Sequence, residues 1–107
     1  MSKWEGLTQK QWREQLRELL QTNDEALRRS IVVIYRQQIP QERVLGEAII
    51  EDKVGFTAFD AEILGSFAKQ IEHGNKLSDK QMAIARNKMP KYWRQLMNIS
   101  KRKMANK

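Results

Sequence analysis

The sequence predicts a mainly α-helical protein, a small bundle made of two antiparallel helical hairpins. Three observations predict this class. Apolar residues recur at helical spacing in four segments, a helix-start signal precedes each segment, and the links within each pair are short enough for antiparallel neighbours. The 107 residues suit one domain. We assign residues 1–107 to it, with a flexible basic tail from about residue 101 to 107.

The first two predicted helices are joined at Thr22-Asn23. Thr8 caps the first helix and forms a capping box with Gln11 three residues later. Asn23 caps the second helix, whose segment 31–35 is rich in β-formers but is continued by residues typical of helix. We expect this helix to end at Ile39-Pro40, because proline disfavours a helical conformation in the residue before it.

Residues 41–57 carry weaker signals, and two interpretations stay open. Residues 41–45 fit one more helical turn, stopped by Gly46. Residues 48–50 and 54–56 fit a short β-hairpin around residues 47–57, which would have to lean on the helices to persist. The acidic and basic residues Glu51, Asp52 and Lys53 lie between these two apolar runs.

The third predicted helix begins at Thr57 and ends near His73. Asp60 is placed as an acidic variant of the capping-box partner, three residues after the cap. Gly74 is the natural left-handed residue after a helix C-terminus. The buried stripe of this helix consists of Ile63, Leu64, Phe67, Ala68 and Ile71.

The last predicted helix, residues 77–103, carries most of the positive charge. From residue 75 to the end there are ten Lys or Arg and one acidic residue, whereas residues 1–74 hold ten basic and twelve acidic residues. Ser78 and Gln81 form its capping box, and Pro90 predicts a kink or break near Met89. Trp93 falls on its apolar stripe, while Tyr92 lies at the edge, where it could be buried or exposed.

The basic side of this helix predicts a nucleic-acid contact surface. Phosphate recognition needs several cations that reach a line of charges together, and a helix face supplies them in order. The plain alternative is a solvated outer face, and such helices also bind acidic proteins and membrane surfaces. The candidate nucleic-acid-binding residues are Lys80, Lys88, Lys91, Arg94, Lys101, Arg102 and Lys103.

Composition excludes several kinds of site. Without cysteine there can be no disulfide or thiolate metal site, and we expect no catalytic residue, metal or cofactor. His73 suits the dipole of a helix C-terminus, and the acidic-x-Lys spacing of residues 51–53 is a weak nuclease signal in so charged a chain. We find no apolar run of about 18 residues or signal segment, and therefore expect a cytoplasmic protein without membrane contact.

Residues 55–97 resemble segments of small phage- and plasmid-encoded proteins, some of which adjoin helicase-like domains. The strongest marks are Gly55-Phe56, Asp60, Leu77-Ser78-x-Lys80-Gln81, Arg86, Lys91-Tyr92 and Gln95-Leu96. The resemblance implies that the protein comes from a mobile genetic element and acts together with nucleic acid. We therefore predict a non-enzymatic accessory protein that binds DNA or RNA. The alternative is a small inhibitor or adaptor of a host-defence or nucleic-acid-processing complex (anti-CRISPR-like), and homodimerisation stays open with so small a core.

Overall fold

The computed structural model describes residues 4–45 and 55–105, with side chains described at 4–37 and 55–103. Within these ranges the chain forms α-helices, one 3-10 helix and no strand. The elements are α1 (Gln9–Thr22), α2 (Asp24–Leu45), α3 (Ala58–Glu72), α4 (Asp79–Lys88), η1 (Met89–Tyr92) and α5 (Trp93–Ala105). The mainly helical class is confirmed. The predicted β-hairpin and residues 51–53 lie almost wholly outside the described residues.

Helix starts are formed by the caps that the sequence predicts. The Ser78 hydroxyl accepts from the Gln81 backbone N–H at 3.1 Å, and the Gln81 side chain accepts from the Ser78 N–H at 2.9 Å. Thr8 and Gln11 form the same reciprocal pair. Each box satisfies two backbone donors that have no partner inside the helix. At α2, the Asn23 side chain accepts from the Ala26 N–H at 2.9 Å.

Helix α2 continues through Pro40 to Leu45, so its predicted end at Ile39-Pro40 is wrong. Proline removes one backbone hydrogen bond and crowds the preceding turn, which weakens a helix without forbidding its continuation. The residues after Pro40 include Gln, Glu, Arg and Leu, which all favour helix. The interpretation of residues 41–45 as a helical turn is confirmed, as part of α2.

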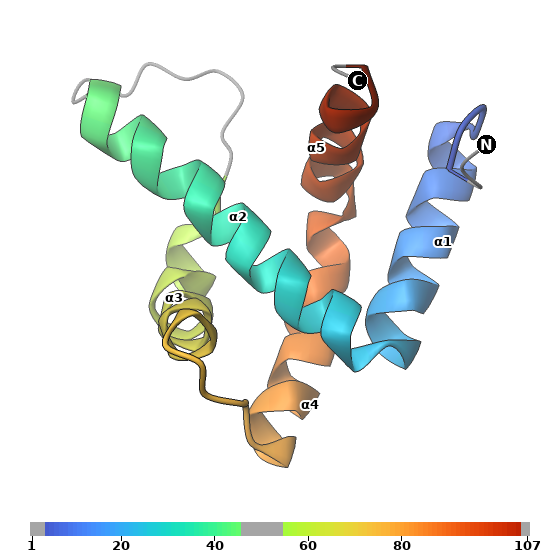
Figure 1. Cartoon of the computed structure of the whole chain (residues 1–107). Helices are drawn as coiled ribbons and strands as arrows, with labels where there is room; N and C mark the ends of the chain where they lie inside the picture. The colour runs from blue at the N-terminus through green and yellow to red at the C-terminus, as the bar shows by residue number, and fades with distance from the viewer. Residues whose placement is uncertain (1–3, 46–54, 106–107) are drawn as a thin grey trace.

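The predicted break near Met89 is confirmed. Helix α4 ends at Lys88, and the 3-10 helix η1 leads into α5. Pro90 lies in the first turn of η1, where a missing backbone donor is tolerated because that group has no helical partner. Figure 1 shows α4, η1 and α5 running end to end as one column. None of the helices in the described ranges is long and apolar enough to cross a bilayer.

The helices do not pair as the two predicted hairpins. Helix α2 packs most extensively against α3, and α1 packs against α5 to about the same extent as against α2. Both views show α3 crossing α2, and Figure 1 shows α1 and α2 diverging from their shared link. Trp12, Leu16 and Leu20 of α1 share one buried cluster with Leu96 and Met97 of α5. The single linking residue, Asn23, keeps two helix ends close, but the apolar faces decide which helices pack.

Aromatic residues near the two ends of the chain contribute to the same core. The Trp4 ring stacks on the buried Trp12 ring with centroids 5.0 Å apart, so Trp4 folds back onto α1. Tyr92, whose exposure the sequence left open, is buried, and Trp93 is half-buried. The aromatic side chains of η1 and α5 are therefore mainly structural.

Candidate nucleic-acid interface

Four of the predicted contact residues lie on α5 with exposed side chains: Arg94, Lys101, Arg102 and Lys103. We call them the α5 cations. None of them forms an ion pair with any residue in the described part of the chain. Arg94 and Lys101 are seven residues apart and face the same way, with Arg102 beside them. Lys103 lies toward α2, at the edge of an apolar groove.

Lys101, Arg102 and Lys103 belong to α5, which continues to Ala105, and not to a tail starting near residue 101 as predicted. Cations in the last turn of a helix interact favourably with its dipole, which favours this extension. Their backbone is already ordered, so contact with a polyanion would require ordering of the side chains only. The helix therefore presents these charges at lower entropic cost than a flexible tail.

The ammonium groups of Lys88 and Lys91 both contact the Asp60 carboxylate. Lys91 Nζ lies 2.6 Å from Asp60 Oδ2, and Lys88 Nζ lies 3.1 Å from Asp60 Oδ1. The Tyr92 hydroxyl donates to Asp60 Oδ2 at 2.7 Å. Asp60 is fully buried. These four residues, the Asp60 cluster, join the start of α3 to the break between α4 and α5.

The prediction that Asp60 completes a capping box is wrong. The Thr57 hydroxyl does accept from the Asp60 backbone N–H, but the Thr57 backbone N–H donates to the Tyr92 hydroxyl at 3.1 Å. A buried carboxylate is stable only when cations or donors compensate the loss of water. Two lysines and a tyrosine provide that compensation, so the Asp60 side chain faces η1.

The Asp60 carboxylate remains ionised at neutral pH. Burial alone would raise the pKa of Asp60, but hydrogen bonds from Lys91, Tyr92 and Lys88 outweigh it and lower that pKa to about 2. The hydrogen bond to Asp60 raises the pKa of Lys91. Two ammonium groups facing one carboxylate leave one net positive charge. The net positive charge of the Asp60 cluster is thus about half of the charge that Lys88 and Lys91 alone would present to a polyanion.

The remaining basic residues of the column are dispersed. Lys80 is exposed in the first turn of α4, at the opposite end of the column from Lys101, Arg102 and Lys103 (Figure 1). Arg86 donates to Asp24 of α2 at 2.9 Å, so part of its charge is compensated. The fold therefore brings together the α5 cations and the Asp60 cluster, and leaves Lys80 apart.

Sequence analysis missed one aromatic residue beside this surface. Phe59, in the first turn of α3, is 85% exposed, and Lys88 Nζ lies 5.1 Å from the centroid of its ring. A second cation and ring meet on α5, where the Arg94 guanidinium lies 5.3 Å from the Trp93 ring. The available signal was that Phe59 lies at the edge of the predicted apolar stripe of α3.

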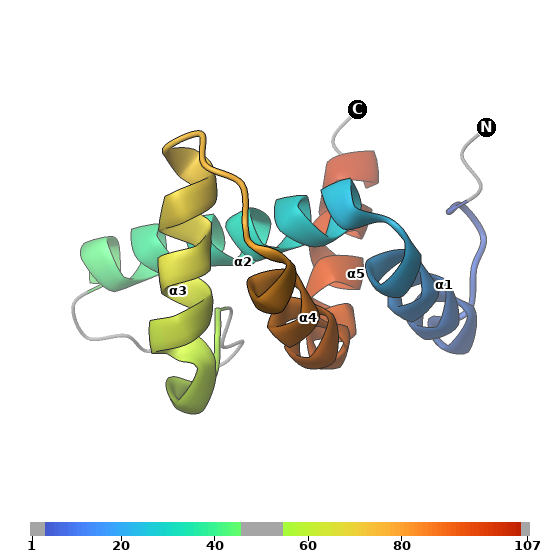
Figure 2. The ribbon, with the colours of Figure 1, turned by 90° about the horizontal axis from the view of Figure 1, so that it is seen from below.

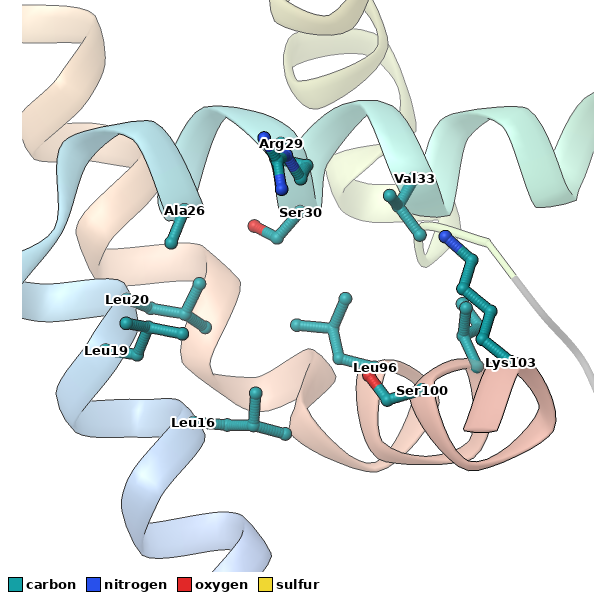
Figure 3. A pocket seen from close by; sticks show the side chains of 11 residues that line it. Leu16, Leu19, Leu20, Ala26, Arg29, Ser30, Val33, Leu96, Ser100 and Lys103 are labelled. Carbon is teal, nitrogen blue, oxygen red and sulfur yellow. The ribbon is translucent and has the colours of Figure 1, made fainter. Parts of the chain in front are cut away.

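An apolar groove of about 230 Å³ lies between α1, α2 and α5. Figure 3 shows Leu16, Leu20 and Leu96 around it, with Arg29 and Lys103 at its margin. Arg29 also pairs with Glu25 one turn earlier, at 3.5 Å. The groove combines apolar walls with cations at the rim, which suits an apolar group that carries negative charge beside it.

Within the described residues there is no group of three or more His, Cys, Asp or Glu side chains placed to hold a metal ion. Comparison of the chain with protein-family models, curated proteins and solved structures gave no match. Its function must therefore be inferred from the chemistry of its own surface.

Proposed function

We propose that the protein is a non-enzymatic accessory protein that binds nucleic acid through phosphate contacts made by the α5 cations. The observation that supports this is the set of four exposed, helix-borne cations that no described acidic residue neutralises. The Asp60 cluster adds one net charge next to them. The resemblance of residues 55–97 to phage and plasmid proteins agrees with such a role.

Contacts of this kind give affinity without base recognition. Lysine and arginine on a helix face neutralise phosphates and release counterions, whatever the sequence of the nucleic acid. Base reading in the major groove requires side chains that reach the base edges from a helix lying in the groove. Arg94, Lys101 and Arg102 lie along one side of a helix whose opposite face is buried, while Lys103 lies toward α2 at the end of the helix. We therefore propose binding that is largely independent of sequence.

The test is a salt titration with short DNA and RNA probes. Four α5 cations and one net charge from the Asp60 cluster would neutralise about five phosphates, giving a log–log slope of about −4 to −5 on duplex DNA. We expect a clear mobility shift at low salt that weakens steeply as salt rises. Absence of binding to both DNA and RNA at low salt would contradict the proposal.

The apolar groove favours a second candidate function, a protein inhibitor or adaptor. An amphipathic helix can insert apolar side chains between α1, α2 and α5 while its acidic residues face Arg29 and Lys103. Such a partner would belong to a host-defence or nucleic-acid-processing complex. This function uses the apolar groove, whereas phosphate binding relies mainly on Arg94, Lys101 and Arg102 on the exposed side of α5. Lys103 borders both surfaces.

The two functions can be separated with Val33→Arg, which places a charge in the groove. If the groove holds a protein partner, this variant should lose co-purification of that partner and keep the salt-dependent shift of DNA. The matched control is Ala83→Arg, which adds the same charge at an exposed position on α4. Unchanged co-purification in the Val33 variant would exclude the groove as the docking site.

A further inference from the structure

Phe59 is the exposed large apolar side chain of the described surface, with 85% of it accessible. Other aromatic side chains of the described residues, such as Trp12, Phe67 and Tyr92, are buried in the core. Exposure of one apolar residue is ordinary by itself. Phe59 differs from an ordinary exposed residue because the Lys88 ammonium group is fixed next to its ring.

The cation beside Phe59 is held in place. Lys88 Nζ lies 5.1 Å from the ring centroid and is anchored at 3.1 Å by the buried Asp60 carboxylate. The same carboxylate holds Lys91 at 2.6 Å. An exposed ring with an ammonium group beside it suits a single strand, since a base can stack on the ring while the cation meets a phosphate.

The chain that leads to Phe59 is hydrogen-bonded to α5, the helix that carries the proposed phosphate-binding residues. Gln95 of α5 donates to the Gly55 carbonyl at 3.0 Å and accepts from the Gly55 N–H at 2.8 Å. The segment leading into α3 is thereby fixed to the first turn of α5. Arg94 precedes Gln95, and Lys91 lies one turn earlier. The start of α3, with Phe59 and Asp60, is therefore joined both to η1 and to the first turn of α5.

We propose that Phe59 is a stacking platform for an unpaired base, so that the ligand of this surface is single-stranded nucleic acid. This inference rests on the proposed nucleic-acid function and names its substrate class. In a duplex the faces of the bases are stacked on each other, so Phe59 cannot use them without disrupting the helix. A single strand exposes its bases and gains the stacking contact in addition to the phosphate contacts.

The test compares Phe59→Leu and Phe59→Trp with the unchanged protein, using a 20-nucleotide oligo-dT and a 20-base-pair duplex at one salt concentration. Leucine keeps an apolar side chain but has no ring face. We expect Phe59→Leu to weaken oligo-dT binding about tenfold and to leave duplex binding and the salt slope unchanged. Phe59→Trp should retain or strengthen oligo-dT binding. Because Phe59 is exposed, both variants should keep the helical circular dichroism signal.

Each outcome has one meaning. Equal losses on both probes, or no loss on oligo-dT while the protein still binds it, would overturn the stacking role and leave phosphate binding intact. Failure of the unchanged protein to bind either probe, together with capture of an acidic protein, would overturn the proposed function itself. Selective loss on oligo-dT with rescue by tryptophan would establish the inference.

Discussion

Replacing Asp60 by Asn is expected to lower the free energy of unfolding by about 2 kcal/mol. The change removes the buried charge that Lys88, Lys91 and Tyr92 all contact. The loss should stay below the largest values known for buried ion pairs, because both lysines retain access to water, with exposures of 22% and 49%. Urea unfolding followed by circular dichroism measures the change. The control is Glu62→Gln, an exposed position on the same helix, which should change stability by less than about 0.5 kcal/mol.

The stability of the unchanged protein and that of Asp60→Asn should respond differently to acid. The pKa of Asp60 is lowered from 3.8 to about 2 on folding, so the unfolded chain takes up this proton first as the pH falls. The stability from the Asp60 cluster is complete above about pH 4 and is lost as the pH approaches 2. The difference between the unchanged protein and Asp60→Asn should therefore shrink over that range. A difference that stays constant from pH 5 to pH 2 would show that the Asp60 charge contributes no stability.

Replacing the four α5 cations by Gln should produce the largest loss of nucleic-acid binding. Removing four of about five phosphate contacts should weaken duplex binding at low salt by about 100-fold or more. The log–log salt slope should become about four units less negative. Fluorescence anisotropy over a range of salt concentrations measures both quantities. The substitutions lie at exposed positions and Gln is a good helix former, so the helical content should change little.

A matched control distinguishes contact with the α5 cations from attraction to the overall positive charge of the protein. Lys10, Arg17, Lys69 and Lys76 are exposed cations on other parts of the fold, and replacing them by Gln changes the net charge equally. An equal loss in this control would indicate attraction to the whole molecule instead of contact with α5. Asp60→Asn provides a second check, because it is less stable but more positive and should bind no more weakly than the unchanged protein.

The local sequence determined where helices begin and where one of them breaks. The capping boxes at Thr8 and Ser78 and the cap at Asn23 use partners three residues apart, so their signals lie within one turn. Pro90 acts on its own turn in the same way. Pro40 shows the limit of this reasoning, since its local bias was outweighed and α2 continues past it.

Only the tertiary structure decided which helices pair and which charges stay exposed. Nothing near Asp60 in the sequence indicates that Lys88 and Lys91 will meet it, because that contact depends on how α3 lies against η1. The partition of the basic residues into the Asp60 cluster and the free α5 cations follows from this packing, as does the exposure of Phe59. Charge and periodicity thus determined the elements and the basic character of the C-terminal part. Contacts between residues distant in sequence decided which of its cations remain available to a ligand.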